Sequence, residues 1–130
     1  MQQPGAHTRD EHQLFVYGTL MRGQPNARQL VAAAFIGRAQ TVATFTLIWW
    51  QGYPGLRRGG NTSVSGELYQ VSPALLVALD EFEGHPTLFQ RDRVLLSGGG
   101  AAQAYLVPQG AGLSAAVIAS GDWRTAGPRR

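Results

Sequence analysis

Several residue types are absent from this chain, and each absence excludes a class of protein. The 130 residues include no cysteine and no lysine. Disulfides, thiolate catalysis and cysteine-based zinc sites are therefore impossible. No apolar run approaches the ~20 residues that a membrane-spanning helix needs. Residues 1–12 are polar and lack the apolar stretch of a secretory signal, so we expect a cytoplasmic protein with no membrane partner.

Metal, nucleotide and hydrolase motifs are also missing. The histidines are His7, His12 and His85, and none has a partner at HxxxH or HExxH spacing. The serines show no GxSxG pattern, and the glycines match neither the Walker nor the dinucleotide fingerprint. We therefore expect no metal site.

The charge balance is mildly basic, with eleven arginines against eight acidic residues and a net charge of +3. A nucleic-acid-binding protein gathers its basic residues on one face, often among aromatic side chains. Here the arginines are scattered, and four of them form two adjacent pairs in loop-like or terminal sequence, Arg57-Arg58 and Arg129-Arg130. We expect no nucleic-acid partner.

The remaining composition favours one folded domain. With 44% hydrophobic residues, a chain of this length can bury a single core. We expect that domain over residues 13–124, with a flexible leader at 1–12 and a tail at 125–130.

Residue patterns predict an α+β fold. Strand signals occur at residues 14–17, 37–50, 64–71, 88–96 and 103–107. One helix is expected to begin at Pro25, with Leu30, Val31, Ala34 and Phe35 on one face. A second follows the N-cap Ser72 and ends near Gly84. Residues 51–62 are rich in glycine and proline and predict a long loop. Five or more strands with two helices favour a sheet that is curled or closed into a small barrel.

The end of the first strand is a candidate ligand site. Gly18 directly follows the buried strand, and a glycine there lets the backbone turn sharply and approach a ligand. The N–H groups of Tyr17, Gly18, Thr19 and Leu20 can then form a concavity for a carboxylate or an oxyanion. The alternative is that Gly18 only ends the strand.

The end of the second helix carries a candidate general base. Helical spacing places Glu83 near the boundary of the core. Partial burial and the helix dipole would both raise the pKa of its carboxyl, which suits a general base. The alternative is a solvated surface residue, which is how we interpret Asp80 and Glu81. Trp49, Trp50 and Tyr53 are interpreted as core and loop anchors rather than a base-stacking platform.

Taken together, these stretches resemble a known family. Residues 15–26 (FVYGTLMRGQPN) resemble the signature loop of the gamma-glutamylcyclotransferase-like family, in particular its gamma-glutamylamine cyclotransferase branch. Residues 79–84 (LDEFEG) resemble the family's second motif, whose final glutamate is catalytic. Residues 66–69, 88–91 and 120–123 are similar to further family segments, so the resemblance runs from about residue 13 to 124 in the family's order.

The resemblance implies a small mixed β-barrel of five to seven strands with flanking helices, and cyclisation of a gamma-glutamyl group to 5-oxoproline without a cofactor. By this resemblance Glu83 is the general acid and base, and residues 17–20 hold the glutamyl group. Tyr105 aligns with a tyrosine that lines the glutamyl pocket. Residues 43–61 match weakly, although that region is expected to border the leaving amine. Phe89 stands where relatives often have tyrosine.

Substrate and activity stay open at this stage. Gamma-glutamylamines, gamma-glutamyl amino acids and a gamma-glutamylated biosynthetic intermediate all suit the family. One alternative is a non-catalytic module that binds or senses a gamma-glutamyl ligand. Retention of Glu83 favours catalysis, because a binder of a carboxylate gains nothing from a second nearby anion. A further alternative is a basic barrel that binds single strands, which predicts salt-dependent affinity for oligonucleotides.

Overall fold

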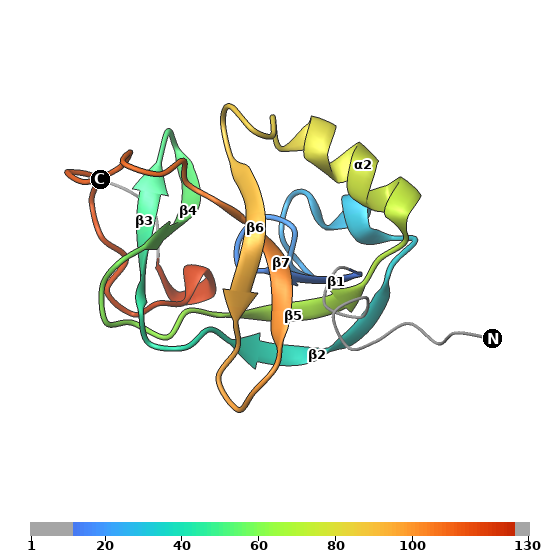
Figure 1. The fold of residues 1–130 in the computed structure, drawn as a ribbon, viewed down its shortest axis with the longest axis horizontal. Helices are drawn as coiled ribbons and strands as arrows, with labels where there is room; N and C mark the ends of the chain where they lie inside the picture. The colour runs from blue at the N-terminus through green and yellow to red at the C-terminus, as the bar shows by residue number, and fades with distance from the viewer. Residues whose placement is uncertain (1–11, 127–130) are drawn as a thin grey trace.

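The computed structural model describes residues 12–126, so most of the expected leader (1–12) and tail (125–130) lies outside the described residues. Within this range the chain forms seven strands, one α-helix and two 3-10 helices (Figure 1). In order they are β1 (Gln13–Val16), η1 (Ala27–Leu30), β2 (Ala34–Gln40), β3 (Phe45–Trp50), β4 (Tyr53–Arg58), β5 (Ser65–Gln70), α2 (Pro73–Phe82), β6 (Gln90–Leu95), β7 (Ala101–Leu106) and η2 (Trp123–Thr125). The expected α+β class is confirmed.

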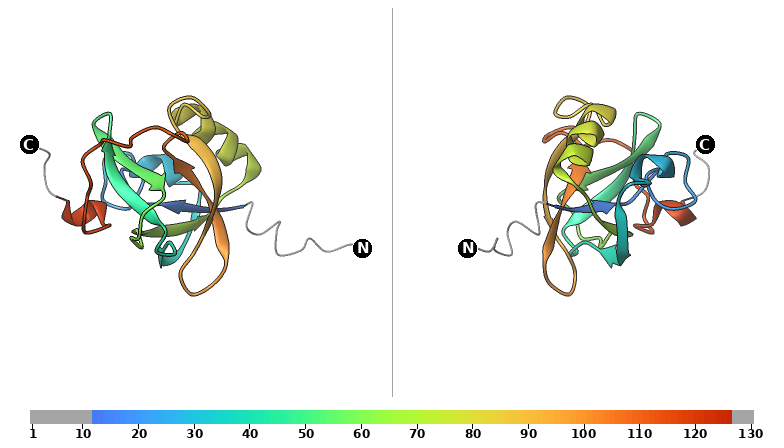
Figure 2. Two further views of the ribbon diagram at one scale, coloured as in Figure 1. Left: turned by 60° about the vertical axis from the view of Figure 1, so that its left-hand side comes forward. Right: turned by 90° about the vertical axis from the view of Figure 1, so that its right-hand side faces the viewer.

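The strands form one mixed sheet. Its order is β2-β5-β1-β7-β4-β3, and β6 pairs antiparallel with β7 outside this order. β1 lies in the middle, antiparallel to β5 and parallel to β7. The views in Figure 2 show that the sheet curls strongly. Within residues 12–126 no ladder joins the end strands β2 and β3, so the sheet is curled rather than closed.

Both faces of β1 are buried, because successive side chains of a strand point to opposite faces. Leu14 and Val16 belong to a cluster that includes Leu76 and Leu79 of α2. Phe15 and Tyr17 belong to a second cluster, inside the curl of the sheet, with residues of β3, β4 and β7. The bend that follows β1 therefore begins at a strand that is packed on both faces.

The predicted second helix is present and its ends are defined by local chemistry. The Ser72 hydroxyl accepts a hydrogen bond from the Leu75 N–H at 3.1 Å, and Pro73 occupies the first turn. At the other end Gly84 has a φ of +68°, which glycine adopts without strain. The N–H of Gly84 donates to the Glu81 carbonyl at 3.1 Å and that of His85 to the Asp80 carbonyl at 2.9 Å. These two bonds form a Schellman motif and make Glu83 the C-cap residue.

The prediction of a helix from Pro25 to about Phe35 is wrong. Only the four residues of η1 are helical, and β2 begins at Ala34. β2 pairs antiparallel with β5, with one register shift between Phe35 and Gly37, and this pairing outweighs the helix propensity of the three consecutive alanines. Val31, expected on a buried helix face, is 87% exposed.

The prediction of a loop over residues 51–62 is also wrong in its first half. β3 and β4 form a hairpin in which Trp50 pairs with Tyr53 across a two-residue turn. Gln51 and Gly52 both have positive φ, 52° and 88°, as a type I′ turn requires. Gly55 is not a loop signal but a close contact, because a Cβ there would collide with Trp50 and Val107.

Candidate active site

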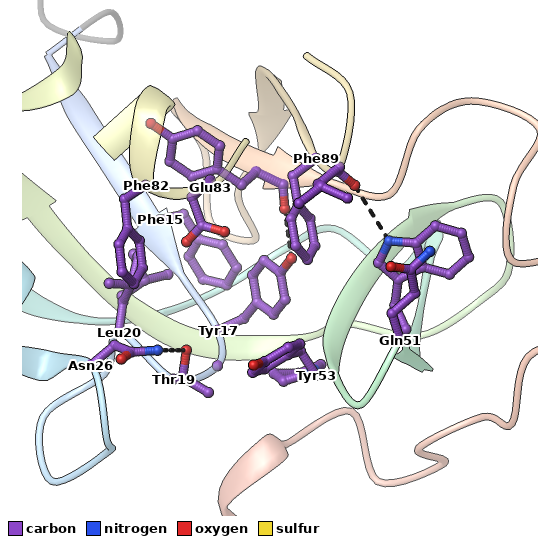
Figure 3. A pocket seen from close by; sticks show the side chains of 16 residues that line it. Phe15, Tyr17, Thr19, Leu20, Asn26, Gln51, Tyr53, Phe82, Glu83 and Phe89 are labelled. Carbon is purple, nitrogen blue, oxygen red and sulfur yellow. Dashed lines mark hydrogen bonds between the residues drawn. The ribbon is translucent and has the colours of Figure 1, made fainter. Parts of the chain in front are cut away.

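A cavity of about 410 Å³ opens between the end of β1, the tip of the β3–β4 hairpin and the C-terminus of α2 (Figure 3). All six residues that the sequence analysis singled out, Tyr17, Gly18, Thr19, Leu20, Glu83 and Tyr105, line it. The structure therefore brings the bend after β1 and the end of the helix to one space. The functional roles given to these residues stay predictions.

The bend at residues 17–20 is held from several sides. A Cβ on Gly18 would collide with the ring of Pro54, so the glycine is required by a close approach between β1 and β4. A left-handed backbone conformation is not the reason, because Gly18 is not among the positive-φ residues. Asn26 donates from its backbone N–H to the Thr19 carbonyl and from its side chain to the Thr19 hydroxyl, both at 2.9 Å.

Three backbone N–H groups of the bend donate to no carbonyl in the described turns and loops, so they are available to a ligand. Among the turn and loop hydrogen bonds of residues 12–126, none is donated by the N–H of Gly18, Thr19 or Leu20. Such consecutive donors suit an anionic ligand group.

Among the described residues that line the cavity, Glu83 is the only one with a carboxylate. Its position at the Schellman cap directs the side chain away from the helix, and Figure 3 shows the carboxylate pointing into the cavity towards Tyr17. Within residues 12–126 no arginine or hydrogen-bond donor pairs with it. Burial without such a partner raises the pKa of the Glu83 carboxyl to about 7.

Tyr17 forms the wall between the bend and the helix end. Its hydroxyl donates to the Tyr105 carbonyl at 2.5 Å and accepts from the Leu56 N–H at 3.2 Å. Burial, and next the charge of Glu83, raise the pKa of Tyr17 well above its ordinary value, although the Leu56 hydrogen bond opposes this. Tyr17 is therefore a neutral residue that joins β1, β4 and β7.

The interpretation of Asp80 as a solvated surface residue is wrong. Arg91 donates to both Asp80 oxygens, from Nε at 2.7 Å and from Nη2 at 3.0 Å, and the Tyr105 hydroxyl donates to the same carboxylate at 2.7 Å. Burial alone would raise the pKa of Asp80, but the hydrogen bonds from Arg91 and Tyr105 and the charge of Arg91 outweigh it and lower the pKa. This network ties the last turn of α2 to β6 and β7. Glu81 is exposed, as expected.

Glu67 is a residue that the sequence analysis missed. It is only 2% exposed, and its carboxylate accepts the Arg22 N–H at 2.9 Å and the Tyr69 hydroxyl at 3.0 Å. Arg22 and Arg124 lie within 3.6 and 3.8 Å of the other oxygen. Arg22 follows the bend directly, so Glu67 anchors the bend to β5. In the sequence, the two-residue spacing that puts Glu67 and Tyr69 on one face of a strand could have indicated that they interact.

The far wall of the cavity is aromatic. Trp49 packs edge-to-face on Trp123, with ring centroids 4.9 Å apart, and is a core anchor as expected. Trp50 and Tyr53 line the cavity together with Phe89, so they are more than anchors. Phe89 offers a ring and no hydroxyl at this position.

Within residues 12–126 no three histidine, aspartate or glutamate side chains gather as a metal ion would require. No helix in the same part of the chain is long and apolar enough to cross a membrane.

Comparison with known proteins agrees with the residue motifs. A family model described as gamma-glutamyl cyclotransferase, AIG2-like, matches residues 14–125. The chain belongs to this family. The resemblance identified from residues 15–26 and 79–84 is thereby confirmed.

Relatives within the AIG2-like family come from animals and bacteria. The rat gamma-glutamylaminecyclotransferase is 40% identical over 91 residues, a match that covers 60% of this chain and 58% of the rat protein. A putative gamma-glutamylcyclotransferase of Vibrio cholerae is 35% identical over 113 residues, covering 87% of this chain and 96% of the relative. The chain thus spans little more than half the length of the mammalian relatives and nearly all of the bacterial one.

Two solved structures share the fold. The crystal structure of a mouse AIG2-like protein superposes with a TM-score of 0.68 at 34% identity, covering 74% of this chain and 76% of the mouse chain. A uropathogenic E. coli-specific protein superposes with a TM-score of 0.76 at 26% identity, covering 87% of this chain and 92% of the other.

Proposed function

We propose that the protein is a gamma-glutamyl cyclotransferase, which cyclises the glutamyl group of a small substrate to 5-oxoproline and releases an amine. The observation that carries this proposal is the unpaired Glu83 carboxylate, with its pKa raised to about 7, in the same cavity as the donor-rich bend at residues 17–20. Family membership and the relatives named as cyclotransferases support the same reaction class.

The bend at residues 17–20 binds the glutamyl group in this proposal. Its N–H groups suit the substrate carboxylate, and they also suit the γ-carbonyl oxygen as negative charge develops on it. The cavity holds the α-amino nitrogen close to the γ-carbonyl carbon, so the reaction gains rate from proximity.

Glu83 moves the proton. The ionised carboxylate accepts a proton from the α-amino group as its nitrogen forms a bond to the γ-carbonyl carbon. The resulting carboxylic acid returns that proton to the departing nitrogen as the original amide bond breaks. The ring closes to 5-oxoproline, the amine leaves, and Glu83 is restored without any co-reactant. A pKa near 7 suits both halves of this transfer, since the group must accept and donate near neutral pH.

A purely binding role fits the cavity less well. A half-buried carboxylate without a cationic partner is unfavourable for the folded protein and repels the carboxylate of a glutamyl ligand. A binder has no use for such a group, whereas a general base requires it.

The test is turnover of a panel of gamma-glutamylamines and gamma-glutamyl amino acids, followed as 5-oxoproline. We expect the wild-type protein to form 5-oxoproline and Glu83→Gln to lose at least 1000-fold in kcat, because an amide cannot accept the proton. The control is Glu81→Gln, which removes the same charge from the exposed side of the helix end. Turnover by Glu83→Gln at the wild-type rate would remove Glu83 from this role, and no product from any substrate would reject the proposed reaction.

A further inference from the structure

The cavity has a second end, opposite the bend and built by the tip of the β3–β4 hairpin. Trp50 and Tyr53 close the ladder, and Gln51 lies between them in the turn. The Trp50 indole N–H donates to the Leu88 carbonyl at 3.3 Å, which joins the hairpin tip to the segment after α2. Figure 3 shows Gln51 and Phe89 at this end, away from Thr19 and Asn26.

Large apolar side chains are exposed at the mouth of this second end. Tyr53 is 56% exposed and Leu88 51%, and both line the cavity. Exposed apolar groups gathered at the rim of a cavity are typical of a ligand contact surface. A ligand that covers them with its own apolar part removes that surface from water.

The same end offers no cationic side chain to a carboxylate on the leaving group. Of the residues that line the cavity within 12–126, none is an arginine or a histidine, and Glu83 is the only acid. A carboxylate next to the departing nitrogen would lie near Glu83 without a compensating cation.

From this arrangement we propose that the leaving group is an amine with an apolar tail and no carboxylate, such as an arylalkylamine, and that Trp50, Tyr53 and Leu88 form its binding site. We call these three residues the amine subsite. This inference rests on the proposed cyclotransferase function and adds the chemical class of the amine. The tail packs on the amine subsite, while the scissile nitrogen stays beside Glu83.

The first test compares three substrates that share the glutamyl group. Gamma-glutamyl-phenethylamine and gamma-glutamyl-phenylalanine differ only in one carboxylate, and gamma-glutamyl-ε-lysine carries both a carboxylate and an amino group at the far end. We expect kcat/KM for the phenethylamine compound to exceed the other two at least tenfold. Equal values, or a preference for either amino acid, would overturn the amine subsite.

Binding separates this inference from the proposed reaction. Gamma-glutamyl-phenethylamine and gamma-glutamyl-methylamine, neither of which has a carboxylate on its leaving group, are titrated calorimetrically into Glu83→Gln, where no chemistry is expected. Preferential binding of the phenethylamine compound without wild-type turnover would reject the cyclisation and retain the amine subsite. Equal affinities for the two compounds would reject the amine subsite whether or not turnover occurs.

A charge placed at the hairpin tip gives the second test. Gln51→Arg adds a cation beside the amine subsite, and Gln51 already has the positive φ that the turn requires. We expect it to reduce the preference for phenethylamine over phenylalanine at least fivefold. The matched control is Gln109→Arg, the same substitution at an exposed position that does not line the cavity. An unchanged preference in Gln51→Arg would place the leaving group elsewhere and overturn the proposal.

Discussion

Replacing Glu83 with glutamine is predicted to stabilise the protein at alkaline pH while it abolishes turnover. Burial without a cationic partner holds the pKa of this carboxyl at about 7, against an ordinary value of 4.5. Below pH 4.5 the group is protonated in both the folded and the unfolded chain, so its ionisation does not affect the free energy of unfolding. As the pH rises from 4.5 to about 7, the unfolded chain loses the proton first, and stability is lost across this window.

The size of the effect follows from the pKa difference. One pKa unit corresponds to about 1.4 kcal/mol, so the rise from 4.5 to about 7 sets an upper bound of about 3–4 kcal/mol. Glu83 is only partly buried, and solvent screening reduces that bound. We therefore expect Glu83→Gln to gain about 1–2 kcal/mol at pH 8. For a domain of this size the gain corresponds to a rise in Tm of about 4–8 °C.

The assay is thermal and urea denaturation of both proteins at pH 4, 6 and 8. The gain should be absent at pH 4, partial at pH 6 and complete at pH 8. Glu81→Gln controls for the helix dipole, since it removes a negative charge from the same exposed helix end. Equal stability of wild type and Glu83→Gln at pH 8, or an equal gain in Glu81→Gln, would refute the argument that burial sets the pKa.

Further predictions concern the pH profile and the supports of the site. In the wild type kcat/KM should rise with pH through about 7, the pKa of Glu83, and a rise already complete at pH 5 would contradict the assignment. Gly18→Ala should lose about 1–3 kcal/mol of stability and most activity because its Cβ meets Pro54, whereas Gly37→Ala, with open space at its Cβ, should lose neither in the same denaturation and turnover assays. Glu67→Gln should lower the free energy of unfolding by about 1–2 kcal/mol in urea, because its charge-assisted bonds to Arg22 and Tyr69 weaken. Tyr105→Phe should cost about 1 kcal/mol by removing the hydroxyl that donates to Asp80, and an unchanged urea midpoint would argue against that bond.

Local chemistry explains which elements could be predicted from the sequence. The limits of α2 depend on Ser72, Pro73 and Gly84, whose effects act within one turn of the helix. The position of Glu83 beside a core boundary follows from the same local pattern. The residues of the bend and of the helix end were also recognisable as two family motifs.

Long-range pairing explains the errors. Residues 34–40 carry helix-favouring alanines, but they form a strand because β5 lies alongside with a matching register. Pro54 and Gly55 are typical of loops, yet they sit in β4, where Gly55 makes room for Trp50 and Val107. Contacts between distant parts of the chain also determine the site. Arg91 pairs with Asp80 from a strand and Arg22 contacts Glu67 from a loop, so these pairings could not be predicted before the register was known.

The bend at residues 17–20 and the helix end that carries Glu83 are far apart in the chain. Contacts with the strands hold them in place on either side of the cavity. The bend is fixed by Glu67 from β5 and Pro54 from β4. The helix end is fixed by Asp80, through Arg91 of β6 and Tyr105 of β7. The Tyr17 hydroxyl then joins the two halves, because it donates to the backbone of Tyr105 itself. A change at Asp80 or Glu67 would therefore alter the distance between the donors of the bend and Glu83 without touching the substrate, and we expect such changes to lower kcat more than they raise KM.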